Sequence, residues 1–180
     1  DDRLTGDDGP NLIEGDGGSD RITGWGGDDH LEGEGPYVHA YGNDRISGLK
    51  GDDVIYGDGG EDAAGDDVLL GGDGDDLVHG DHAYFAANAG TDAIRGGRGD
   101  DELWGDWISD TDPAPYEGAA DDVRSGRGAD TLRGNGGDDF LIGDLGSDYA
   151  DGGEDNAMDD PVTDVDHDEC GAEEEVDCEA

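Results

Sequence analysis

Aliphatic residues recur along this chain two positions after an aspartate, and short glycine-rich stretches separate them. Two clear copies are GGDGDDLVH, from Gly71 to His79, and GGRGDDELW, from Gly96 to Trp104. Both fit the pattern Gly-Gly-x-Gly-x-Asp-x-U-x, in which U is a large aliphatic residue. The first six positions predict a tight turn that ends in a carboxylate, and the last three predict a minimal strand.

The aliphatic position eight of this unit recurs throughout residues 1–163. Because each three-residue strand must reverse at the next turn, two units make one coil, and equivalent strands of successive coils lie parallel. We therefore predict an all-β parallel β-roll over residues 1–163, followed by an acidic C-terminal cap over residues 164–180. The inward-facing residues would be Leu4, Ile13, Ile22, Leu31, Ile46, Ile55, Leu69, Val78, Ile94, Leu103, Val123, Leu132, Leu141, Ala150 and Val162.

Alternate turns of such a coil fall on opposite edges, and each turn ends at position six. On the first edge, named edge A here, position six is Asn11, Asp29, Asp53, Asp76, Asp101, Asp130 and Asp148. On the second, named edge B, it is Asp2, Asp20, Asp44, Asp67, Asp92, Asp121, Asp139 and Asp160.

The two edges differ in the length of their turns. All edge-A turns are short, whereas most edge-B turns carry an insertion between positions three and four: 36–41, 60–64, 83–89, 108–118 and a shorter one near Asp155. The insertions hold aromatic residues, among them Tyr37, Tyr84 and Tyr116. Loops on one edge of a solenoid often bind a protein or glycan partner, although surface loops also vary in length at little cost.

The chain has 180 residues, 37 glycines and a net charge of −43. This charge makes nucleic acid an improbable partner, because phosphates would be repelled. No apolar run long enough to span a membrane and no signal peptide is present, and the chain starts within a repeat, at Asp1; we expect a processed product or a fragment. Without cations, the carboxylates would repel one another and the core is thin, so the chain is predicted to be largely unfolded.

These motifs resemble the repeats-in-toxin, or haemolysin-type, calcium-binding nonapeptide family. The resemblance covers about nine-tenths of the chain and implies a right-handed β-roll with calcium between successive turns on both edges. Each ion would take backbone carbonyls of positions one to four and the position-six carboxylates of two stacked turns, such as Asp53 with Asp76, or Asp44 with Asp67. The edge-A glycines that would support these sites are Gly24, Gly27, Gly48, Gly51, Gly71, Gly74, Gly96, Gly99 and Gly128.

The residue types suit calcium, which binds six to eight oxygens at about 2.3–2.6 Å. Glycine allows positive φ, so that carbonyls turn inward, and aspartate is short enough to reach the ion. The gaps between stacked turns predict on the order of a dozen ions.

Four features depart from the family's pattern. Asn11 replaces an aspartate, Ala119 replaces a position-four glycine, Ala150 replaces a larger aliphatic residue, and the insertions interrupt the turns of edge B. We therefore expect edge A to keep the family's sites more closely than edge B. Edge B also carries an acidic row at position two, which could supply further ligands or form solvated surface: Asp16, Glu34, Asp58, Asp81 and Asp106.

Catalytic motifs are missing: the sequence has no nucleophile elbow, HExxH motif or P-loop, so we predict a protein that is not an enzyme. Its two cysteines, Cys170 and Cys178, would form a disulfide in an oxidising compartment; two free thiols are the alternative.

The function predicted is a secreted calcium-binding module, extracellular or at the cell surface, that folds on binding calcium. Two alternatives remain open. The chain could be a structural adhesin, surface-layer or filament subunit that self-associates through its solenoid ends, or an appendage of a larger secreted enzyme or toxin.

Overall fold

The computed structural model describes residues 1–35, 42–59, 65–81, 90–106, 119–137 and 139–152, and in these ranges it contains fourteen β-strands and no helix. Seven strands follow turns of edge B: β1 (Arg3–Thr5), β3 (Arg21–Thr23), β5 (Arg45–Lys50), β7 (Val68–Asp73), β9 (Ala93–Arg98), β11 (Asp122–Gly128) and β13 (Phe140–Gly146). Seven follow turns of edge A: β2 (Leu12–Glu14), β4 (His30–Glu34), β6 (Val54–Asp58), β8 (Leu77–Asp81), β10 (Glu102–Asp106), β12 (Thr131–Arg133) and β14 (Tyr149–Asp151).

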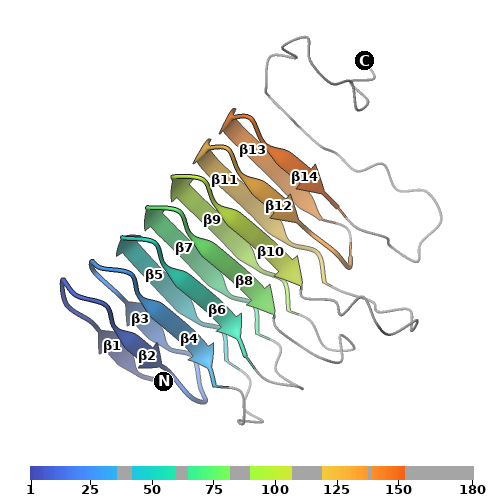
Figure 1. Ribbon diagram of the computed structural model, residues 1–180. Coiled ribbons are helices and arrows are strands. Elements are labelled where there is room, and N and C mark those ends of the chain that lie inside the picture. The colour runs from blue at the N-terminus through green and yellow to red at the C-terminus, as the bar shows by residue number, and fades with distance from the viewer. Residues whose placement is uncertain (36–41, 60–64, 82–89, 107–118, 138, 153–180) are drawn as a thin grey trace, which may run out of the picture.

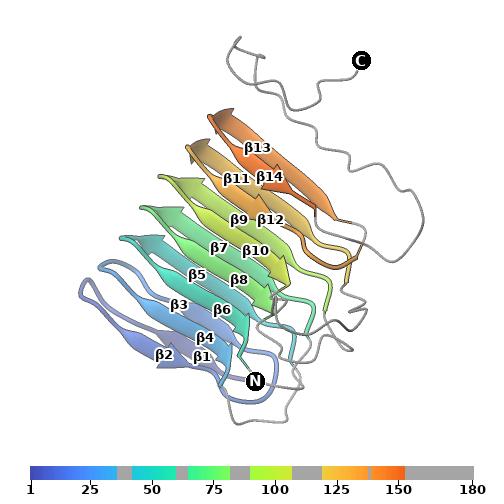
Figure 2. The same cartoon turned by 45° about the vertical axis from the view of Figure 1, so that its right-hand side comes forward.

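Odd and even strands form separate sheets, and every pairing between neighbouring strands is parallel. The orders are β1-β3-β5-β7-β9-β11-β13 and β2-β4-β6-β8-β10-β12-β14, so each strand pairs with the strand one coil away. Figure 1 shows the coils stacked from the blue N-terminal end to the orange β13 and β14, and Figure 2 shows the two sheets facing each other. The predicted parallel β-roll with two units per coil is confirmed.

The core is a double row of single aliphatic side chains, one from each strand. In one sheet Leu4, Ile22 and Ile46 are partners in successive strands, and the same register continues through Leu69, Ile94, Val123 and Leu141. The other sheet has the equivalent row from Ile13 to Ala150. All are buried except Leu4, Ile13 and Ala150, which are half-buried in the first and last described coils.

The outer face of the even-numbered sheet carries a column of stacked rings. Tyr56, His79 and Trp104 share one register, with ring centroids 5.2 and 5.4 Å apart, and the Arg133 guanidinium lies 4.5 Å from the Trp104 ring centroid. His30 lies one row away, but its ring is still 5.6 Å from that of Tyr56. This column stabilises the sheet through contacts between adjacent strands.

Several predicted features lie outside the described residues: the insertions, the rung formed by Asp160 and Val162, and the C-terminal segment with Cys170 and Cys178. Within the described part of the chain, no helix has the length and apolar character needed to cross a bilayer.

We predict that Leu103→Ala destabilises the calcium-loaded protein by about 2–5 kcal/mol, because Leu103 is fully buried and its truncation leaves a cavity in a core one side chain thick. The matched control is Leu12→Ala, since Leu12 is 67% exposed and should change stability by less than about 0.5 kcal/mol. Denaturant unfolding in saturating calcium measures both. Equal effects of the two substitutions would contradict the proposed core.

Candidate metal centre

The position-six aspartates form two continuous ladders, one along each edge. On edge A the backbone N–H of Asp53 donates to Oδ1 of Asp76, and the N–H of Asp76 donates to Oδ1 of Asp101, both at 2.9 Å. On edge B the N–H of Asp44 donates to Oδ1 of Asp67 at 2.7 Å. Each carboxylate therefore reaches back to the coil before it and fixes the spacing between turns.

The second oxygen of these carboxylates is buried and has no hydrogen-bond partner. A buried carboxylate oxygen without a partner is strongly unfavourable, because the charge loses its hydration and gains nothing in return. The two rows of these oxygens lie where the family resemblance places calcium. They belong to Asp29, Asp53, Asp76, Asp101 and Asp130 on edge A and to Asp20, Asp44, Asp67, Asp92 and Asp121 on edge B.

Position-one glycines leave the space that these oxygens occupy. A Cβ added to Gly24, Gly48, Gly71 or Gly96 would collide with Oδ2 of the aspartate five residues later. None of these four glycines has a positive φ, so their role is to leave room and not to permit an unusual turn. Position four differs: Gly27, Gly51, Gly74, Gly99 and Gly128 all have positive φ, as predicted.

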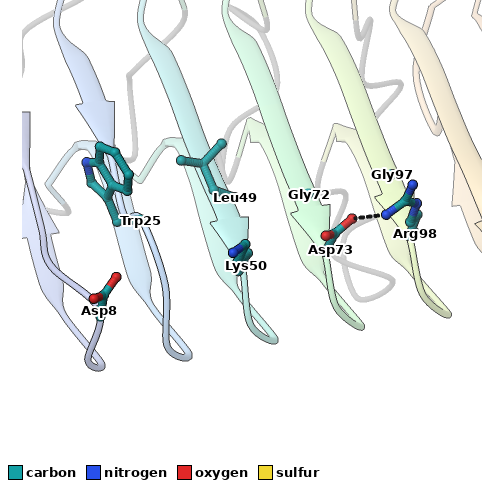
Figure 3. Close-up of a pocket in the computed structure, with 8 residues that line it drawn as sticks. All are labelled: Asp8, Trp25, Leu49, Lys50, Gly72, Asp73, Gly97 and Arg98. Atoms are coloured by element: carbon teal, nitrogen blue, oxygen red, sulfur yellow. Dashed lines mark hydrogen bonds and ion pairs between the residues drawn. The ribbon is translucent and has the colours of Figure 1, made fainter.

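Position two is left-handed at some non-glycine residues of the edge-A turns. Trp25 has a φ of 90° and Leu49 a φ of 85°, and their side chains are 53% and 40% exposed. Figure 3 shows them in one row with Gly72 and Gly97, along a groove that also holds Arg98 and its ion pair with Asp73 at 3.1 Å. The short turn therefore directs its position-two side chain to solvent.

In the inserted turns of edge B, the side chain at position two is buried instead of exposed. Glu34, Asp58, Asp81 and Asp106 each end a strand, lack a positive φ, and are 0–1% exposed. The interpretation of this row as solvated surface is therefore wrong for these four residues. It holds for Asp16, which belongs to a short turn, has a φ of 64° and is exposed.

Burial raises the pKa of many of these carboxyls in the fold without a bound cation. On edge A desolvation raises the pKa of Asp53 to about 6, that of Asp101 to about 7 and that of Asp76 to about 8, and neighbouring carboxylates add to the effect. On edge B desolvation and nearby carboxylates raise the pKa of Asp67 and of Asp121 to about 9. Edge B was expected to depart further from the family's metal sites than edge A. The pKa values of its position-six carboxyls are nevertheless raised strongly.

The remaining predicted ligands lie near the ends of the ladders. Asp2 is exposed, and its N–H donates to Asp20. Oδ1 of Asn11 accepts from the N–H of Asp7 at 2.8 Å, so this side-chain oxygen already has a hydrogen bond within its own turn. Asp139 and Asp148 are half-buried, and their Oδ1 atoms accept from Asp121 and Asp130 at 3.0 Å.

Ser125 was not singled out from the sequence. It stands at position one of its turn, where the neighbouring turns have glycine. Its Oγ donates to the Gly143 carbonyl at 2.6 Å, one coil further on. This serine could have been found from the period alone, since it falls where Gly96 and Gly143 stand in register.

Two ladders of buried carboxylates, cradled by glycine, define a metal-binding parallel β-roll. The family model of the RTX calcium-binding nonapeptide repeat matches residues 1–35, 40–63, 63–81, 85–110 and 118–157, and the chain belongs to this family. No curated protein and no solved structure matches it significantly. The chain is therefore a calcium-binding repeat module. Its carboxylate oxygens, for which the position-one glycines leave space, are ligands that calcium prefers.

Gly71→Ala should weaken calcium binding, because the added Cβ would meet Oδ2 of Asp76 while the backbone conformation at Gly71 stays ordinary. We expect a loss of about 1–3 kcal/mol in the stability of the calcium-loaded fold and a higher calcium midpoint for folding. Gly26→Ala is the control, since its Cβ would have no neighbour closer than 3.8 Å. Circular dichroism during a calcium titration compares them, and equal midpoints would refute the steric role of Gly71.

Without calcium, the fold should lose stability as the pH rises from about 4 to about 9. A carboxyl whose pKa is raised by folding binds its proton more tightly in the fold than in the unfolded chain, where the value for Asp is about 3.9. The cation-free fold is thus most stable below pH 4 and loses stability as the pH rises through the pKa values of Asp53, Asp76 and Asp67.

The unfolded chain is already ionised at pH 6–8, so folding around calcium should release few protons, and the calcium midpoint should change little over this range. Titrations at pH 6 and pH 8, with calorimetry in buffers of different ionisation enthalpy, measure the midpoint and the proton release. A midpoint that falls steeply between pH 6 and pH 8 would show that calcium instead displaces protons from a chain that is already folded.

Proposed function

We propose that this chain is a secreted calcium-binding module that is largely unfolded in low calcium and folds outside the cell when it binds about a dozen ions. The observation that carries the proposal is the double row of buried carboxylate oxygens without partners. Such a structure is self-repelling until cations enter it, so ion binding and folding would be one event.

The charge of the chain supports the same conclusion. About a dozen calcium ions would contribute roughly +24, which offsets about half of the net charge of −43. The loaded module would still be strongly acidic, and like-charged surfaces repel one another. These properties suit a soluble, rigid element that does not aggregate as it folds.

The location follows from the ion supply. Calcium-binding modules that work outside cells have dissociation constants of about 10⁻⁴–10⁻³ M, because extracellular calcium is abundant. A coil that folds at such concentrations would stay unfolded in the cytosol and fold after export. Membership of the RTX repeat family supports secretion.

The full chain in excess EDTA at low salt should lose most of its strand signal in circular dichroism and regain it in millimolar calcium. Magnesium at the same concentration should restore less, because it requires a smaller octahedral site and dehydrates reluctantly. Equilibrium dialysis gives the number of ions bound. A strand spectrum that is the same in EDTA and in calcium would refute coupled folding.

The structural and appendage roles use the same coil but differ in what contacts it. Light scattering across the calcium titration separates the structural role from a free monomeric module: a calcium-dependent increase in mass supports a structural subunit, and a constant monomer mass opposes it.

A further inference from the structure

Edge B contains a third carboxylate at a place where the family's repeat has a turn and no side-chain ligand. Glu34, Asp44 and Asp58 each offer an oxygen, and these oxygens lie within 4.8 Å of one another. Two oxygens bound to one calcium at about 2.4 Å can be at most about 4.8 Å apart, so the spacing of the three groups meets this limit for a shared ion.

The burial of this cluster distinguishes it from ordinary acidic surface. Glu34 is 0% exposed and Asp58 is 1% exposed, and neither oxygen of either side chain has a hydrogen-bond partner. Asp44 uses Oδ1 to accept from the N–H of Asp20 at 2.6 Å, while its Oδ2 is buried without a partner. Five carboxylate oxygens are thus enclosed with no compensating donor.

The cluster belongs to a column of acidic residues, each of which lies just before an insertion in the chain. Glu34, Asp58, Asp81 and Asp106 are partners in successive strands of one sheet. Oδ2 of Asp81 accepts from the N–H of Gly90 at 2.5 Å, and Oδ2 of Asp106 accepts from the N–H of Ala119 at 3.1 Å. Both bonds join position two to position four across an insertion, and Oδ1 of each aspartate stays buried without a partner.

Short turns show what the acidic side chain replaces. In the two short turns of edge B position two is left-handed, since Asp16 and Asn135 have φ values of 64° and 72°. The Asp16 side chain is exposed, and the side-chain amide of Asn135 donates to the Asp106 carbonyl. In the inserted turns the backbone at position two is extended, so the chain can leave for the insertion, and the acidic side chain turns inward instead. A side-chain carboxylate thereby compensates for the interrupted turn.

We propose that the inserted turns of edge B form a second kind of cation site, in which Glu34, Asp44 and Asp58 bind one ion through three carboxylates. The inference rests on the proposed calcium-dependent function and adds to it a difference between the edges. With three negative charges around one ion, this site should bind calcium more tightly than the two-carboxylate sites of edge A, and should prefer a trivalent lanthanide to calcium.

The test is Glu34→Gln in the full chain, which removes one charge and keeps the size of the side chain. We expect the calcium stoichiometry in equilibrium dialysis to fall by one ion, or the tightest binding step to weaken by at least tenfold. The matched control is Asp16→Asn, which removes a charge at position two of a short turn on the same edge. Asn135 occupies the equivalent position in another short turn, so this control should bind like the wild type.

Terbium provides a second readout that does not need the variant to fold. Crystals of the wild-type chain grown in calcium and soaked briefly in terbium should show their strongest anomalous peak between Glu34, Asp44 and Asp58. Terbium peaks confined to edge A would overturn the proposal, as would a Glu34→Gln protein that binds calcium like Asp16→Asn. Failure of the wild type to bind calcium would instead refute the proposed function itself.

Discussion

Both sheets depend on what each position-six carboxylate does with its two oxygens. Oδ1 accepts a hydrogen bond from the backbone of the preceding coil, as Asp76 does from Asp53, and this bond sets the distance between turns. Oδ2 is left pointing into a buried space that glycine keeps open. The same side chain thus connects two coils and presents a buried oxygen to a cation between them, so under the proposed function the stacking of the coils and ion binding would be one process.

The thin core makes this dependence strong. Each strand contributes one core aliphatic side chain, which is buried in eleven of the fourteen described strands and half-buried in β1, β2 and β14. At about 1.5–3 kcal/mol for each fully buried aliphatic, the core offsets only a small part of the cost of ordering a glycine-rich backbone. Under the proposed function cations supply the rest, which would allow a chain with 52 acidic residues to form an extended and regular structure.

The fold could be predicted from the sequence because the nine-residue period determines which residues form strands and which strands pair. The spacing from Asp53 to Ile55 and from Asp76 to Val78 predicted strand, register and core, and the structure places these residues as expected. It did not reveal which glycines are needed for space, because Gly71 and Gly74 look alike in the pattern but differ in φ. It also left the position-two acids undecided, since Asp16 and Asp58 occupy the same place in the repeat.

What separates Asp16 from Asp58 is the backbone, and the insertion changes the backbone. In the short turns that contain Asp16, Trp25 and Leu49, position two is left-handed and its side chain is exposed. Before an insertion, position two ends its strand without a positive φ, and the acidic side chain there is buried. Under the proposal above, a cation stabilises the enclosed carboxylate, so the longer turn would depend on the ion that its acidic residue binds. On edge B, the acidic residue at position two is buried where an insertion follows, as at Asp58, and exposed in the short turn of Asp16. The length of the turn and the number of buried carboxylates are therefore linked.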